Sequence, residues 1–65
     1  MPSADAQAFA RQIAFYVSAD ELVHRCAGLL LDFHWVVGLM AETRNLTRDH
    51  AEIVVRHRWP AAATT

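Results

Sequence analysis

The sequence predicts an all-α domain of three helices, in which a helical hairpin is followed by a shorter third helix and the whole assembles as a helical dimer. Three observations predict this fold class. Apolar residues recur at spacings of three and four, N-cap signals stand at Ser18 and Thr47, and no segment shows the apolar–polar alternation of a strand. The length of 65 residues predicts a single helical domain, 1–65.

The first helix is predicted over residues 4–17. Ser3 caps its start, and Asp5 lies in the first turn, where a negative charge interacts favourably with the helix dipole. One face of this helix is apolar and is expected to pack against the rest of the domain. Its members are Ala6, Phe9, Ala10, Ile13, Tyr16 and Val17.

The second helix is predicted over residues 19–44 and begins at the clearest local signal in the chain. Ser18 and Glu21 form a capping box, and Val17 and Leu22 flank the cap at the positions of a hydrophobic staple. The link to the first helix is therefore very short, and the two helices are expected to form an antiparallel hairpin. Apolar residues occupy most of the circumference of this helix, which is typical of a helix buried on nearly all sides.

The third helix is predicted over residues 48–58 after a tight turn. Asn45 suits the left-handed conformation that such a turn needs, and Thr47 caps the helix that follows. The helix ends near Arg58, because a residue that precedes a proline, here Trp59 before Pro60, disfavours helical geometry. The tail, residues 60–65, is expected to be flexible.

The composition predicts a protein partner. A hydrophobic fraction of 54% is high for 65 residues, because so short a chain has little interior. Small domains usually need disulfides, a metal or oligomerisation, and Cys26 is the only cysteine. We therefore expect a homo-oligomer or a larger protein complex, in which a non-enzymatic interaction module acts through the apolar surface of the second helix. The expected contact residues are Phe33, Trp35, Val36, Leu39, Met40 and Trp59, with Phe15 as a further candidate.

A helix-turn-helix is the alternative hypothesis. Residues 39–56 match the spacing of that motif, with residues 47–58 as the recognition helix of a DNA-binding transcriptional regulator. Arg48, Arg56 and Arg58 would then contact nucleic acid. However, Glu52 stands four residues from both Arg48 and Arg56, a spacing that is also typical of an ordinary solvated helix face. The interaction module is therefore the main hypothesis.

No residue pattern favours catalysis, a cofactor or a metal. Glu21 and His24 have the (i, i+3) spacing of di-iron carboxylate bundles, but the carboxylates that such a site needs from other helices are not convincingly placed. Cys26 lies within an apolar stretch, where a cysteine behaves as a small hydrophobe. The chain has no Gly-rich phosphate loop and no Ser elbow. We expect that it is not an enzyme.

Charge and hydropathy bear on location and partners. The net charge of −1 creates no global basic field that would attract nucleic acid. The longest apolar stretch, residues 26–41, contains Asp32 and His34, and is too short and too polar to span a membrane. The N-terminus lacks the pattern of a signal peptide. Together with the lone cysteine, these features predict a cytoplasmic protein.

Overall fold

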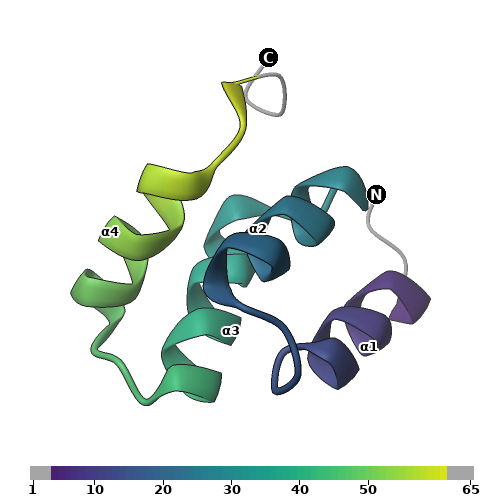
Figure 1. Ribbon diagram of the computed structural model, residues 1–65, viewed down its shortest axis with the longest axis horizontal. Helices are drawn as coiled ribbons and strands as arrows, with labels where there is room; N and C mark the ends of the chain where they lie inside the picture. Colours follow the sequence, from purple (N-terminus) through teal and green to yellow (C-terminus); the bar gives the residue numbers. More distant parts are fainter. Residues whose placement is uncertain (1–3, 62–65) are drawn as a thin grey trace.

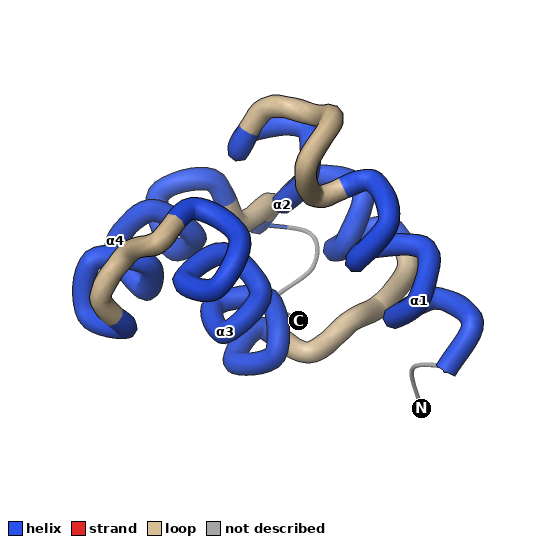
Figure 2. The backbone as a smooth tube through the Cα atoms, turned by 90° about the horizontal axis from the view of Figure 1, so that it is seen from below, coloured by secondary structure: helices blue, strands red, loops and turns tan. Residues whose placement is uncertain are grey.

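The computed structural model describes residues 4–61, so the predicted cap at Ser3 and residues 62–65 of the tail lie outside the described part. Four helices form within the described range: α1 (Ala4–Ile13), α2 (Ala19–Gly28), α3 (Phe33–Arg44) and α4 (Arg48–Arg58). Residues 4–61 contain no strand, which confirms the all-α class, but the prediction of three helices is wrong. The pair α2 and α3 lies at the centre, with α1 and α4 on opposite sides of it (Figures 1 and 2).

The predicted helix 19–44 is interrupted after α2. The backbone N–H of Leu30 donates to the Ala27 carbonyl at 3.0 Å, and that of Leu31 donates to the Cys26 carbonyl at 3.1 Å. This pair of hydrogen bonds is a Schellman motif, which requires its central residue to be left-handed. Leu30 is that residue, with a φ of 61°. The chain therefore turns back at residues 29–32 instead of continuing as a helix.

Asp32 starts α3 immediately after the turn. Its carboxylate accepts hydrogen bonds from the backbone N–H groups of His34 and Trp35, at 3.0 and 3.2 Å. The sequence prediction missed this N-cap because Asp32 stands within an apolar run. It missed the turn because leucine favours helices and seldom adopts the left-handed conformation.

The first helix ends earlier than predicted. The N–H groups of Tyr16 and Val17 both donate to the Ile13 carbonyl, at 2.9 and 3.1 Å, so residues 14–17 form a turn. Ser18 caps α2 as predicted, since its hydroxyl accepts a hydrogen bond from the Glu21 N–H at 3.2 Å. The Glu21 carboxylate accepts a hydrogen bond from Arg25 at 2.8 Å.

The turn between α3 and α4 follows the predicted chemistry. Asn45 is left-handed, with a φ of 56°, and the N–H of Leu46 donates to the Ala41 carbonyl at 2.9 Å. The Thr47 hydroxyl then accepts a hydrogen bond from the N–H of His50 at 3.2 Å. As a result α4 starts at Arg48, and its range coincides with the predicted residues 48–58.

All four helices contribute to one hydrophobic core. Its buried members are Ala10, Ala14, Leu22, Val23, Cys26, Leu31, Val36, Val37, Leu39, Met40, Ala51 and Val55. The turn at residues 29–32 explains this burial, because it folds α3 back onto α2 and encloses side chains that a single straight helix would expose. Val36, Leu39 and Met40, which the sequence predicted as partner contacts, lie in this core and offer no surface to a partner. The excess apolar surface inferred for one long helix is therefore largely internal.

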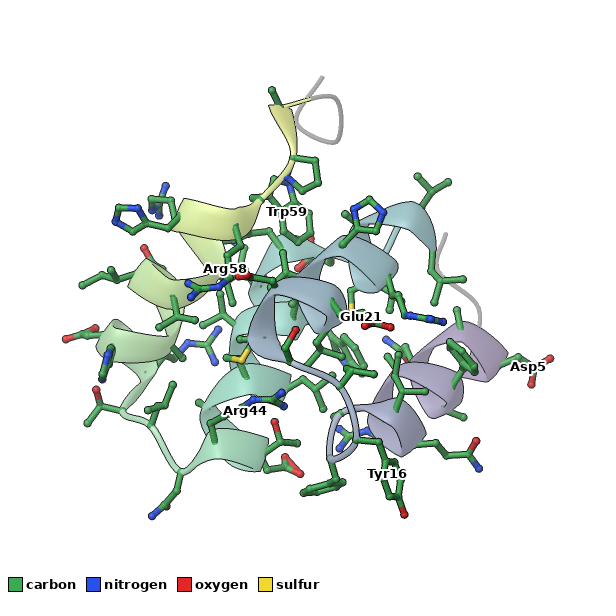
Figure 3. The ribbon with its side chains drawn as sticks, in the orientation of Figure 1. Asp5, Tyr16, Glu21, Arg44, Arg58 and Trp59 are labelled. Atoms are coloured by element: carbon green, nitrogen blue, oxygen red, sulfur yellow. The ribbon has the colours of Figure 1, made fainter. Side chains whose placement is uncertain are left out.

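Arg44 ties the end of α3 to the link between α1 and α2 (Figure 3). Its guanidinium donates to the carbonyl oxygens of Ala14 at 2.5 Å and Val17 at 2.7 Å. The end of a helix leaves carbonyls without intrahelical donors, and a partly buried arginine can satisfy two of them at once. Arg44 thereby holds the turn after α1 in place.

Candidate interaction surface

Six large hydrophobic side chains are exposed among the described residues: Phe9, Phe15, Tyr16, Leu29, Leu30 and Ile53. Three of the six belong to α1 and the turn that follows it. Two more lie in the link between α2 and α3, and Ile53 stands alone on α4. Phe15 and Tyr16, which are neighbours in the chain, are the most exposed of the Phe, Tyr and Trp side chains in residues 4–61.

Two adjacent aromatic side chains, Phe15 and Tyr16, form what we call the aromatic ridge. Phe15 is 72% exposed and Tyr16 is 87% exposed. Tyr16 points away from the body of the domain (Figure 3). The sequence placed Tyr16 on the buried face of a helix reaching residue 17, and this placement is wrong because α1 ends at Ile13. Since the helical repeat stops there, the ring turns outward instead of inward.

A shallow, open hollow of about 600 Å³ adjoins the ridge and is lined by Arg11, Gln12, Ile13, Phe15 and Tyr16. Arg11 is the one charged residue in this lining. Its guanidinium pairs with Glu42 at 3.3 Å and lies 5.6 Å from the centre of the Trp35 ring. The hollow therefore presents aromatic and amide groups beside a cation that already has a counter-charge.

The other predicted contact residues take part in contacts within the chain. The rings of Phe33 and Trp59 meet edge to face, with centroids 5.3 Å apart. The guanidinium of Arg56 lies 5.3 Å from the Phe33 centroid. Trp35 is half-buried beneath Arg11. Phe33, Trp35 and Trp59 thus secure the packing of helix ends and offer only part of their surface to solvent.

The three arginines predicted to contact nucleic acid are also engaged within the chain. Each guanidinium donates to an oxygen on another residue: Arg48 to the His34 carbonyl at 3.3 Å, Arg56 to Glu52 at 2.6 Å, and Arg58 to Asp20 at 2.5 Å. Arg58 also donates to the Val54 carbonyl at 2.9 Å. A phosphate would have to compete with these acceptors for the arginines of α4.

The described residues offer little to a metal ion or to nucleophilic chemistry. No group of three or more His, Cys, Asp or Glu side chains within residues 4–61 is placed to hold a metal. Glu21 and His24 thus lack the further ligands that a metal site needs, and Glu21 is paired with Arg25. Cys26 is fully buried, and burial raises the pKa of its thiol to about 11. Because the thiolate is the reactive form, Cys26 is a poor nucleophile at neutral pH.

Comparison with protein families, with curated proteins and with solved structures finds no match to this chain. Among residues 4–61, no helix combines the length and the apolarity that crossing a bilayer requires. The function is therefore inferred from the chemistry of the surface itself.

Proposed function

We propose that this chain is a small, non-enzymatic helical interaction module whose contact surface is the aromatic ridge. The observation that carries the proposal is the exposure of Phe15 and Tyr16 side by side at an open hollow. Aromatic residues are enriched at protein interfaces and dominate their energetics. Fully burying a phenylalanine side chain stabilises a complex by about 1.5–3 kcal/mol, so two adjacent rings are a substantial anchor.

The partner that this surface fits is a second copy of the same chain. A twofold symmetric interface sets each patch against itself, so a charged patch would repel its own copy. The ridge carries no charge, and the neighbouring Arg11 is paired with Glu42. The ridge of one copy can therefore pack on the ridge of another without electrostatic repulsion, whereas its neutrality gives no attraction for nucleic acid.

The non-enzymatic part of the proposal is supported by the state of the single cysteine. Cys26 is buried and protonated at neutral pH, and so is not available for nucleophilic attack. A lone reduced cysteine is also compatible with the cytoplasmic location that we propose.

The test replaces both rings of the ridge. We expect the wild-type protein to dimerise. Its average molar mass, measured by light scattering across a concentration series, should rise to twice that of the monomer at the higher concentrations. Monomer of the variant carrying Phe15→Ser and Tyr16→Ser, isolated without unfolding and refolding, should not dimerise as its concentration rises. Its helical circular dichroism spectrum should be unchanged, because both side chains are exposed in the monomer.

Ile53→Ser is the matched control, since Ile53 is an exposed apolar residue on another helix. It should leave the dimer intact. Two results would contradict the proposal. The wild-type chain could stay monomeric over the whole series, or the dimer could have the same dissociation constant in the double variant and in the wild type.

DNA binding through α4 is a second candidate function, which the geometry of α3 and α4 favours. The left-handed Asn45, the Thr47 cap and the buried Ala51 match the spacing of a helix-turn-helix motif, in which a tight turn joins two helices. If α4 binds DNA, Arg48→Ala should weaken duplex binding. It should also make the slope of log affinity against log salt concentration less steep by about one, which corresponds to one lost phosphate contact. Fluorescence anisotropy with mixed-sequence duplex at several salt concentrations measures both quantities, and no binding at low salt would exclude this function.

A further inference from the structure

The link between α2 and α3 combines two features that are unfavourable in the folded monomer. Leu30 is held in the left-handed conformation, with a φ of 61°, which the Cβ atom of an L-residue disfavours. The same side chain is 80% exposed, so it gains almost nothing from packing. The link is also short, since only residues 29–32 separate the two helices. Short, strained hinges favour the exchange of identical elements between copies of a protein.

The same residues are well suited to a continuous helix. Leu29, Leu30 and Leu31 are strong helix formers, and the pattern of the sequence predicts one helix over residues 19–44. If this range became continuous, Leu30 would return to ordinary helical geometry and its strain would disappear. The change would also draw α3 and α4 away from α1 and α2 of the same chain.

Ion pairs and hydrogen bonds on both sides of the molecule join residues before the hinge to residues after it. Arg44 binds the carbonyls of Ala14 and Val17, as described above. The remaining pairs are Arg58 with Asp20 at 2.5 Å and Arg11 with Glu42 at 3.3 Å. The hydrophobic core is likewise shared between the two halves. Each half therefore needs the other half, but a second copy supplies an identical one.

We infer that two copies of this chain exchange their α3–α4 halves, with residues 29–32 straightening into a continuous helix. In the exchanged dimer, the α3 and α4 of one copy pack on the α1 and α2 of the other. The core and the cross-hinge ion pairs form again between chains, and the left-handed leucine is relieved. Because this exchange does not use the aromatic ridge, it goes beyond the proposed function and stands independently of it.

Leu30→Gly and Leu30→Ala shift the exchange in opposite directions. Glycine adopts the left-handed conformation without steric penalty and weakens a continuous helix, so Leu30→Gly favours the monomer by roughly 30-fold per chain. Alanine retains the left-handed strain and favours the helix. Adding Asp32→Ala to Leu30→Ala removes a cap that exists only when α3 starts separately, and so favours exchange further.

The experiment is done in the Phe15→Ser, Tyr16→Ser background, in which the ridge cannot pair two copies. Each protein is unfolded in denaturant, refolded at high concentration, diluted, and separated by size-exclusion chromatography with light scattering. We expect a dimer that persists on dilution, because its dissociation requires unfolding. Its fraction should be largest in Leu30→Ala with Asp32→Ala, intermediate with Leu30 retained, and smallest in Leu30→Gly.

The absence of a slowly dissociating dimer in all three proteins, or equal fractions in all three, would overturn the exchange while leaving the proposal for the ridge intact. If Leu30→Ala with Asp32→Ala does not fold, the comparison between Leu30 and Leu30→Gly decides the question. Equal dimer fractions in these two proteins would then count against exchange.

Discussion

Arg44 shows how a single side chain can decide the course of the backbone around it. Its guanidinium binds two carbonyls of the turn that presents the ridge. In the sequence analysis Arg44 was only the last residue of the predicted helix 19–44, because its acceptors lie 30 and 27 residues away along the chain. Long-range hydrogen bonds of this kind produce no local sequence pattern, so they could not be predicted from the sequence.

Replacing Arg44 with Met should therefore lower the free energy of unfolding by about 2 kcal/mol, since partly buried hydrogen bonds to a charged group are worth about 1.5–3 kcal/mol. Urea denaturation measures the change. Arg25→Met is the control, because Arg25 makes only an exposed (i, i+4) pair with Glu21 and should cost about 0.5 kcal/mol or less. Equal losses in the two variants would show that Arg44 has no special role.

Cys26 makes the stability of the domain depend on pH. Burial raises its pKa from 9.0 to about 11, so the unfolded chain releases the thiol proton at a lower pH than the folded chain does. The stabilisation is complete below about pH 9 and is lost as the pH rises from 9 towards 11, by about 2–3 kcal/mol in total. Urea denaturation as a function of pH should show this slope in the wild type.

Cys26→Ala removes the titrating group and should remove this part of the slope, although the smaller side chain lowers the stability at every pH. A slope that is as steep in Cys26→Ala as in the wild type would assign the effect to other groups.

At the scale of elements, the start of a helix was predicted correctly where a polar N-cap residue could be recognised in the sequence. Ser18 and Thr47 are polar residues at the boundary between a turn and an apolar pattern, and the starts of α2 and α4 follow them. The start of α3 was missed although Asp32 is an equally good N-cap, because apolar residues flank it on both sides. The left-handed Leu30 had no local signal at all, since the fold imposes this conformation through the packing of α3 on α2.

Leu30→Gly should stabilise the monomer by about 1 kcal/mol, because glycine is the residue that a left-handed helix end prefers. Leu29→Gly is the neighbouring control. Leu29 has an ordinary φ of −87°, so a glycine there relieves nothing and should destabilise the monomer by up to about 1 kcal/mol. Thermal or urea denaturation at low protein concentration compares the two, and a loss of stability in Leu30→Gly would contradict the claim that this turn is strained.

At the scale of the whole molecule, the fold class was predictable and the exposed apolar surface was not. Helical spacing and caps specify that helices form, but the exposure of Tyr16 depends on the residue at which α1 stops. The prediction of one helix over residues 19–44 left three apolar side chains without a place in the core, namely Val36, Leu39 and Met40. The turn at Leu30 places all three inside the domain. The same turn creates the hinge for the proposed exchange.

The measurement that tests the ridge most directly is an isotope-filtered NOE experiment on an equal mixture of labelled and unlabelled protein. This experiment detects only protons that are close together on different copies. We expect intermolecular NOEs from the ring protons of Phe15 and Tyr16. A dimer that gives no intermolecular NOEs from these two rings, with its contacts instead between the core residues of α2 and α3, would contradict the ridge as the contact surface.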